Sequence, residues 1–350
     1  QSSAREYLAH LENVTKKSDV VDMHLPLQLL VGNVINDVLF GYRYAYDACE
    51  PLLEHVRQMS AAFREGPSSW LFMLCLRVPS MLHVPGVKRA LRCRVPHMHI
   101  ARDFPLPDIR RLEATFNPHE EPTNFVHAYM LKTKDDPSFT REMLAAACTD
   151  LFLAGQETTT TTLRWGMLLL AQHPAVQERI RAEIAAVLGD GASRLMNSRD
   201  RSSMPFTCAT IHEIQRCANI LPLNFALTHK ATAPVRIGAH AIPTDTLVHV
   251  DIHGIHTSEA HFENASKFDP MRYLASDGTT TRREVLERTI PFGFGKRSCA
   301  GEGLARMELF AGVTATLQHY RIEPVEPIDL TPIHGLVQLP KPQKLRLIRV

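Results

Sequence analysis

The chain of 350 residues lacks the signals of several common protein classes. Its most apolar stretch, 163–171, is interrupted by Arg164 and is too short to cross a bilayer. The net charge is only +2, so the basic excess typical of nucleic-acid binding is missing and we expect no nucleic-acid partner. There are no internal repeats and no low-complexity block beyond the threonine run 158–162. What remains is an ordinary globular composition, 45% hydrophobic and 22% charged.

The cysteines form no recognisable framework. All seven are scattered, their number is odd, and none has CxxC spacing, which argues against a zinc site and against a set of disulfides. A reducing compartment is the simpler interpretation. There is also no signal-peptide pattern, and the chain opens with Gln1 rather than Met. We therefore expect a fragment of a longer protein or a trimmed product.

Hydrophobic periodicity predicts a mainly α-helical chain with a small β part. Amphipathic patterns indicate helices over 2–17, 26–40, 49–65 and 123–134. A long helix runs over 140–173, and Pro174 must break it and start the next helix, which ends near Gly189. Pro205 opens another helix, 300–319 form the last one, 235–237 and 246–250 are short strands, and 321–350 end in a hairpin.

The loop 292–301 is the most informative segment, because it holds three glycines and one cysteine just before an apolar helical stretch. Glycine lets a backbone fold tightly and lets a flat ligand approach closely. The positive end of the helix dipole stabilises a thiolate at a helix start, and Arg297 adds a fixed cation. An isolated cysteine is more often a buried structural thiol. The residues around Cys299 instead favour a thiolate presented to something large, planar and electron-poor.

Two further patterns each allow a structural and a functional interpretation. Glu213 and Arg216 share one helix face, which alone indicates a surface ion pair worth a few tenths of a kcal/mol. Apolar neighbours show that part of this helix is buried, so the pair needs another partner, and Arg272 is the candidate. The stretch 154–159 alone indicates a polar helix face with ordinary threonine back-bonding, and Gly155 within it allows close packing or a kink.

Together these segments resemble the cytochrome P-450 family. The loop matches F-x-x-G-x-R-x-C-x-G at all five fixed positions, Phe292, Gly295, Arg297, Cys299 and Gly301. The stretch 154–159 matches the family's oxygen-activation motif, (A/G)-G-x-(D/E)-T-(T/S), at every position. The ion-pair segments resemble its E-x-x-R and P-x-R-F elements, with Tyr273 replacing the usual Phe. From about 140 to 350 the chain follows the animal microsomal drug- and lipid-metabolising group in order and spacing.

The resemblance implies a single cytochrome P-450 domain over 1–350, lacking its N-terminal part with the membrane anchor and first helices. It implies haem b, with the Cys299 thiolate as axial iron ligand. The cofactor-binding residues it implies are Ala154, His229, Phe292, Gly295, Arg297 and Gly301, of which Arg297 and His229 would contact propionates. Glu157 and Thr158 are the implied catalytic acid–alcohol pair. Glu213, Arg216 and Arg272 are the implied structural network beneath the cysteine loop.

The implied function is monooxygenation of a lipophilic small molecule. The implied partners are an NADPH-dependent flavoprotein reductase, docking near Lys296 and Arg297, and cytochrome b5. The intact protein is expected at the endoplasmic reticulum membrane, on its cytosolic face. Apolar or small residues on the long helix (Ala147, Leu151, Ala154), over 221–227 and over 336–338 are the expected pocket walls. Two alternatives stay open: a truncated, catalytically silent, haem-poor relative, and haem-thiolate rearrangement chemistry without a reductase. The intact Glu157–Thr158 pair argues against the second.

Overall fold

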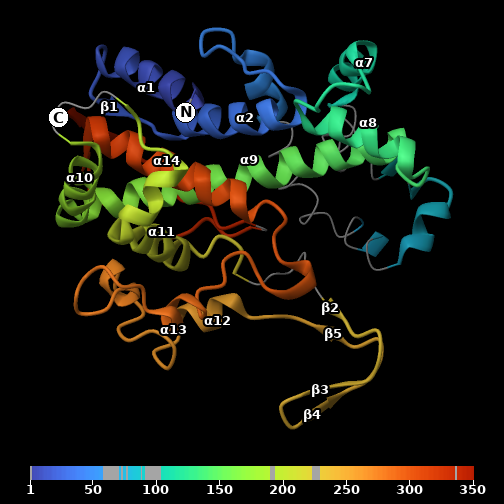
Figure 1. Cartoon of the computed structure of the whole chain (residues 1–350). Coiled ribbons are helices and arrows are strands. Elements are labelled where there is room, and N and C mark those ends of the chain that lie inside the picture. Colours follow the sequence, from blue (N-terminus) through green and yellow to red (C-terminus); the bar gives the residue numbers. More distant parts are fainter. Residues whose placement is uncertain are drawn as a thin grey trace. The chain divides into compact units, whose positions relative to one another are not determined.

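The structure is a computed structural model that describes residues 2–57, 71, 74–75, 78–87, 89–90, 104–189, 194–222, 229–335 and 337–350. It is mainly α-helical with a small β part, which confirms the predicted fold class (Figure 1). The chain folds as two compact units, 1–160 and 161–350. The long helix α9 (Arg141–Gln172) contributes residues to both units. The assignment of 1–350 to a single domain stays a prediction.

Unit 1 is helical, and the predicted N-terminal helices lie where the sequence indicates. The helix predicted over 26–40 begins slightly earlier than expected and ends at Gly41, which adopts φ 75° as a left-handed cap. Asn124 caps the next predicted helix by accepting from the amide of His127 at 2.9 Å. The named elements are α1 (Ser2–Thr15), β1 (Val20–Val21), α2 (His24–Phe40), η1 (Pro79–His83), α7 (Leu106–Thr115), α8 (Phe125–Asp135) and the first part of α9. Residues 58–65 of the helix expected over 49–65 lie outside the described residues.

At Gly155, α9 lies close against α2. A Cβ atom at this position would lie 2.6 Å from Cδ1 of Ile35, so only glycine fits without displacing that side chain. One residue later the buried Gln156 donates from Nε2 to the carbonyl oxygen of Gln28 at 3.0 Å. The glycine of this stretch therefore serves close helix packing within an unbroken α9.

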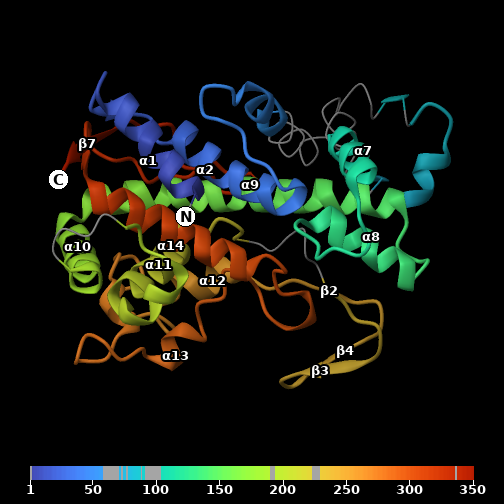
Figure 2. The ribbon, with the colours of Figure 1, turned by 45° about the horizontal axis from the view of Figure 1, so that its top comes forward.

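Unit 2 is built on three mutually packed helices, α10, α11 and α14, which Figure 2 shows gathered together. As predicted, the long helix ends before Pro174 and a new helix starts there. The carboxylate of Glu183 on α10 accepts from the amides of Phe206 and Thr207 at 2.8 Å each, so it caps the free N–H groups that open α11. The helical elements are α10 (Pro174–Leu188), η2 (Ser198–Ser203), α11 (Pro205–Ala218), α12 (Ile252–Thr257), η4 (Pro270–Tyr273), α13 (Arg283–Leu286), η5 (Gly295–Arg297) and α14 (Glu302–His319).

The strands of unit 2 are short and antiparallel. The predicted terminal hairpin is present as β6 (Tyr320–Pro324) and β7 (Leu345–Arg349), in the register Tyr320↔Arg349 to Pro324↔Leu345. Buried Gln177 exchanges two hydrogen bonds with the backbone of Ile322 and so fixes β6 to α10. The predicted strand 235–237 pairs with a strand that the sequence did not reveal. The remaining strands are β2 (His229–Lys230), β3 (Val235–Ile237), β4 (His240–Ile242) and β5 (Leu247–Val248), which pair as β2–β5 and β3–β4.

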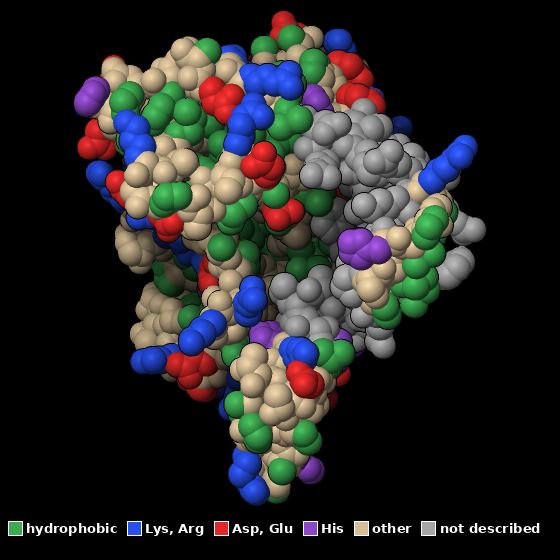
Figure 3. Space-filling view, turned by 90° about the vertical axis from the view of Figure 1, so that its right-hand side faces the viewer, with side chains coloured by type: hydrophobic (Ala, Val, Ile, Leu, Met, Phe, Trp, Pro, Cys, Tyr) green, Lys and Arg blue, Asp and Glu red, His purple; other side chains and the backbone are tan. Residues whose placement is uncertain are grey.

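The strands β2 to β5 form an arm whose side chains are mostly exposed, including Val235, Ile237 and Leu247. In Figure 3 hydrophobic, basic and histidine side chains appear along this arm at the bottom of the view. None of the described helices is long and apolar enough to cross a lipid bilayer.

The close approach at Gly155 gives a test of stability. Gly155→Ala should destabilise the protein by about 1 kcal/mol, because overpacking of about 1–3 kcal/mol exceeds the helix-propensity gain of about 1 kcal/mol. Urea unfolding measures the change. Gly303→Ala on α14 is the matched control, since nothing lies within 4 Å of its Cβ position, and it should be neutral or stabilising. Ile35→Val removes the clashing Cδ1 atom, so in this background Gly155→Ala should lower the free energy of unfolding by less. An equal loss with Ile35 and with Val at position 35 would contradict the packing explanation.

Candidate active site

The cysteine loop is held in shape by its own backbone. Gly293 and Gly295 have φ values of 68° and 73°, which other residues adopt only with strain, and nothing lies within 4 Å of their Cβ positions. The amide of Cys299 donates to the carbonyl oxygen of Phe292 at 2.9 Å and closes the loop. Helix α14 begins directly afterwards, with Gly301 as its N-cap residue. The loop therefore presents an exposed Cys299 at a helix start, as the sequence indicates.

Arg306 on α14 braces the start of this loop. Its guanidinium carbon lies 5.0 Å from the ring centroid of Phe292, within the range of a cation–π contact. Its Nε donates to Glu302 at 2.8 Å, and its Nη1 lies 3.4 Å from Nδ1 of half-buried His212 on α11. Phe292 is thus anchored to two helices. No pattern in the sequence indicated Arg306 or His212 for this role.

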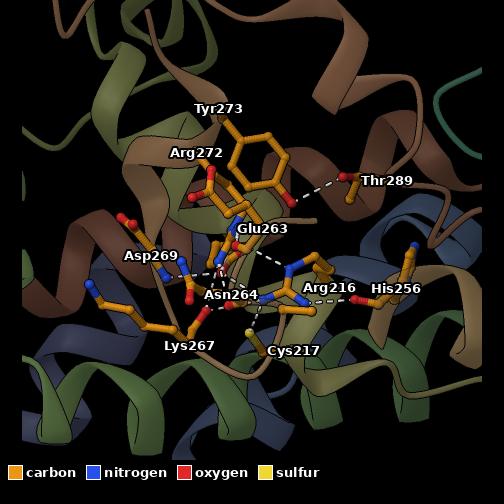
Figure 4. A network of polar contacts seen from close by, with 12 residues as sticks. Arg216, Cys217, His256, Glu263, Asn264, Lys267, Asp269, Arg272, Tyr273 and Thr289 are labelled. Carbon is orange, nitrogen blue, oxygen red and sulfur yellow. Dashed lines mark hydrogen bonds and ion pairs between the residues drawn. The ribbon is translucent and has the colours of Figure 1, made fainter. Parts of the chain in front are cut away.

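Glu213 lies at the centre of a buried ionic network that includes both predicted arginines. Arg216 donates to both carboxylate oxygens of Glu213 at 2.8 Å, and Arg272 donates from Nε to Oε1 at 3.0 Å. The amide of Asp269 adds a fourth donor at 2.9 Å. Side-chain exposure is 0% for Glu213, 1% for Arg216 and 8% for Arg272, so the surface-pair interpretation is wrong. In Figure 4 the labelled Arg216 and Arg272 come from different segments of the chain.

Backbone carbonyl groups accept hydrogen bonds from the guanidinium N–H groups that the single carboxylate cannot reach. Arg216 donates to the carbonyl oxygens of His256 at 2.7 Å and Lys267 at 3.2 Å. Arg272 donates to the carbonyl oxygens of Glu263 and Lys267 at 2.7 and 2.9 Å. Burial is the largest single influence and lowers the pKa of Arg216, but the hydrogen bond to Glu213 and the charges of Glu213 and neighbouring groups together outweigh it, so this pKa lies above its ordinary value. Arg216 therefore stays charged, and the network ties α11 to α12 and to the chain between α12 and η4.

Tyr273, the residue in place of the family's usual Phe, is fully buried beside the network. Its hydroxyl shares a hydrogen bond of 3.0 Å with Oγ1 of Thr289, and the Thr289 hydroxyl in turn lies 3.1 Å from the carbonyl oxygen of Val285. Burial raises the pKa of Tyr273, so the hydroxyl stays protonated. The hydroxyl oxygen that Tyr273 has and Phe lacks is therefore hydrogen-bonded although it is buried.

The 154–159 stretch lies mid-way along α9 in unit 1. Oγ1 of Thr158 donates to the carbonyl oxygen of Ala154 at 2.6 Å, the back-bonding geometry expected of a helical threonine. Glu157 and Thr158 are half-buried, and Ala154 is exposed. Since these residues belong to unit 1 and Cys299 to unit 2, their common role stays a prediction.

The other predicted residues lie at the surface or outside the described part. His229 is exposed on β2, and Arg297 is exposed in η5. Of the expected pocket walls, Ala147, Leu151 and Ala154 lie on α9, with Leu151 exposed by 38%. Residues 223–227 and Leu336 lie outside the described residues.

Comparison with known proteins decides the family. Residues 1–347 match the model of the family described as Cytochrome P450. The chain belongs to the cytochrome P450 family. It is 34% identical over 325 residues to Cytochrome P450 2C44 of Mus musculus, covering 90% of this chain and 63% of that protein. It is 35% identical over 325 residues to Cytochrome P450 2C5 of Oryctolagus cuniculus, covering 91% of this chain and 64% of that protein.

Cytochrome P450 2H2 of Gallus gallus is 34% identical over 365 residues, covering 99% of this chain and 70% of that protein. The chain thus spans less than two thirds of the length of the mouse and rabbit relatives. These relatives agree with the predicted resemblance to animal members of the family.

The family implies haem with a cysteine thiolate as iron ligand, and the residues of this loop fit that group. Cys299 is exposed on a fixed backbone, and Gly301 leaves the space beside its sulfur open, since a Cβ there would lie 3.9 Å from Sγ. The Cβ positions of Gly293 and Gly295 also face open space. Phe294 in the loop and Met307 on α14 are 61% and 44% exposed, so this part of the chain carries exposed apolar side chains. Contact with an apolar macrocycle would remove such a surface from water, which is favourable.

The ionic network gives the second prediction. Glu213→Ala should destabilise the protein by about 3–5 kcal/mol, because it leaves two buried guanidinium groups without their carboxylate. Chemical unfolding followed by circular dichroism measures the loss. Glu287→Ala is the matched control, since Glu287 forms an exposed pair with Arg283, and it should change little. Equal effects of the two substitutions would show that burial of the network contributes nothing.

Proposed function

We propose that the protein is a haem-thiolate monooxygenase in which Cys299 supplies the axial ligand. The observation that carries the proposal is the exposed Cys299 on a loop that two left-handed glycines shape and one backbone hydrogen bond closes. Haem b, when bound, supplies the activation of dioxygen, so that one oxygen atom enters a substrate C–H bond and the other leaves as water. The side chains of this chain bind the cofactor, orient it and supply protons.

The loop residues hold and orient the cofactor. Gly295 and Gly301 keep space for close approach, and Phe292 fixes the loop through its carbonyl bond to the amide of Cys299. Arg297, with its exposed guanidinium, and His229 are the proposed partners of the propionates, because charge-assisted bonds to carboxylates are roughly twice as strong as neutral ones. Ala154 is small and exposed on α9, which suits contact with a flat ligand.

Glu157 and Thr158 are the proposed proton-delivery pair. A carboxyl and a hydroxyl on adjacent residues can hand a proton from water to dioxygen during its reduction. Oγ1 of Thr158 is positioned by its 2.6 Å bond to the carbonyl of Ala154, so the hydroxyl has a defined direction. Without a controlled proton supply, reducing equivalents are lost as hydrogen peroxide.

The proposed substrate is a lipophilic small molecule, in keeping with the small and apolar residues Ala147, Leu151 and Ala154 on α9. The proposed electron donor is an NADPH-dependent flavoprotein reductase docking near Lys296 and Arg297, and cytochrome b5 is a further proposed partner. Both of these cationic side chains are exposed in η5, as docking to an acidic partner requires. We place the intact protein at the cytosolic face of the endoplasmic reticulum membrane.

The third prediction tests the ligand. Cys299→Ser should abolish the thiolate-type absorption band of the reduced, carbon-monoxide-bound protein, because a serine hydroxyl is not ionised at neutral pH. Cys49→Ser is the control, since Cys49 lies in unit 1 and donates to the carbonyl oxygen of Tyr46. A serine variant that keeps the band would refute the assignment. A native chain that takes up no haemin would instead favour the catalytically silent relative.

The fourth prediction concerns Thr158. In the protein loaded with haem and supplied with reductase, Thr158→Ala should leave substrate binding nearly unchanged and raise the peroxide formed per NADPH consumed severalfold. Thr149→Ala is the matched control, because Thr149 makes the same back-bond on α9, to Ala145 at 3.0 Å. An unchanged peroxide ratio in Thr158→Ala would reduce this residue to a packing role.

A further inference from the structure

His256 on α12 connects the ionic network to the chain that leads into the cysteine loop. Its side chain is fully buried, with 0% exposure. Its carbonyl oxygen accepts from Nη1 of Arg216 at 2.7 Å, and its ring Nε2 accepts from the amide of Ile290 at 3.1 Å. One residue is therefore bonded at its backbone to the network and at its ring to the segment just before Phe292.

The acceptor role requires a neutral imidazole, and the surroundings enforce one. Burial, the Arg216 cation and His253 together lower the pKa of His256 to about 4. With Nε2 accepting, the proton sits on Nδ1, which is buried and finds no hydrogen-bond partner in the described part of the chain. An apolar residue would fill this place without burying an unpaired N–H group. Within the described part of the chain, the ring makes one hydrogen bond, with the amide of Ile290, and this bond is what distinguishes histidine from such a residue.

The bond at Ile290 is placed where it can control the loop. Pro291 follows, with a fixed φ and no N–H group of its own, so a shift at Ile290 is passed on to Phe292. The carbonyl oxygen of Phe292 accepts from the amide of Cys299, so the position of Phe292 sets that of the cysteine. The path from Nε2 of His256 to the amide of Cys299 thus runs through two hydrogen bonds and the three residues between them, of which the middle one, Pro291, has a fixed φ.

We propose that His256 is a positioning residue for Cys299, acting as the hydrogen-bond acceptor that registers the cysteine loop against the Glu213–Arg216–Arg272 network. This inference rests on the proposed function, since it assumes that Cys299 is a ligand. It assigns no contact between His256 and the cofactor. Its effect is on the orientation of the sulfur, and therefore on how much of the bound cofactor is thiolate-ligated.

Three substitutions separate this role from simple core filling. His256→Gln places an amide oxygen near the position of Nε2 and keeps an acceptor for Ile290. His256→Asn is equally polar, but its oxygen lies near the position of Nδ1 and falls short. His256→Leu removes the acceptor altogether. His261→Leu is the matched control, because His261 is an exposed histidine on the same segment.

Two measurements are made on the full chain. The first is the fraction of the reduced carbon-monoxide complex with the thiolate-type rather than the thiol-type band. We expect a loss of at least about twofold in His256→Leu and His256→Asn, and native behaviour in His256→Gln and His261→Leu. The second, without haem, is hydrogen exchange at the Ile290 amide, whose protection should fall roughly tenfold in the same two variants.

The outcomes distinguish the two hypotheses. A native chain without any thiolate-type band refutes the proposed function, while the exchange data still judge whether His256 holds Ile290. A native thiolate band that survives intact in His256→Leu overturns the positioning role. If His256→Leu does not fold, equal behaviour of the Gln and Asn variants overturns it. The positioning role is also overturned if, in the unaltered chain, the Ile290 amide exchanges as fast as a loop amide without a hydrogen bond.

Discussion

The geometry of unit 2 depends on one buried carboxylate shared by two guanidinium groups. Removing these three charges from water is unfavourable unless every donor and acceptor is matched, and the match requires segments that are distant in sequence. Glu213 and Arg216 come from α11, Arg272 from η4, and the remaining acceptors are carbonyl groups in the chain before η4 and at α12. The network therefore selects one arrangement of these segments, because any other leaves a charge buried without a partner.

The start of the cysteine loop is held at two points, of which the first also bonds the network. His256 bonds the amide of Ile290 on one side, and Arg306 stacks on Phe292 on the other. Between them the glycines provide the curvature, and the bond from Cys299 to Phe292 closes the loop. The residues before the cysteine are held by these contacts, and Cys299 itself is exposed. The proposed role of Cys299 as a thiolate ligand requires both, a fixed direction and access for a large planar group.

Much of the fold was predictable because its signals are local. Pro174 breaks the long helix as its missing N–H group requires, and the helices at 2–15, 125–135, 205–218 and 302–319 follow the periodicity of the sequence. The short strands of the arm were harder to predict from the sequence. For example, β4 has only three residues and becomes a strand through its pairing with β3. The spacing of Glu213 and Arg216 indicated the pair. Only the positions of Glu263, Asn264 and Lys267 showed how Arg272 is satisfied.

The sequence by itself determined the family, the helical class, the cysteine that serves as candidate ligand and the three members of the ionic network, because these are read from residue types at fixed spacing. The tertiary structure alone decided which of the 18 histidines are buried and what they bond. His256 lies 34 residues before Ile290, and His212 lies 94 residues before Arg306. Contacts at such separations leave no periodic trace in the sequence, since they arise only when segments that are distant along the chain pack against one another.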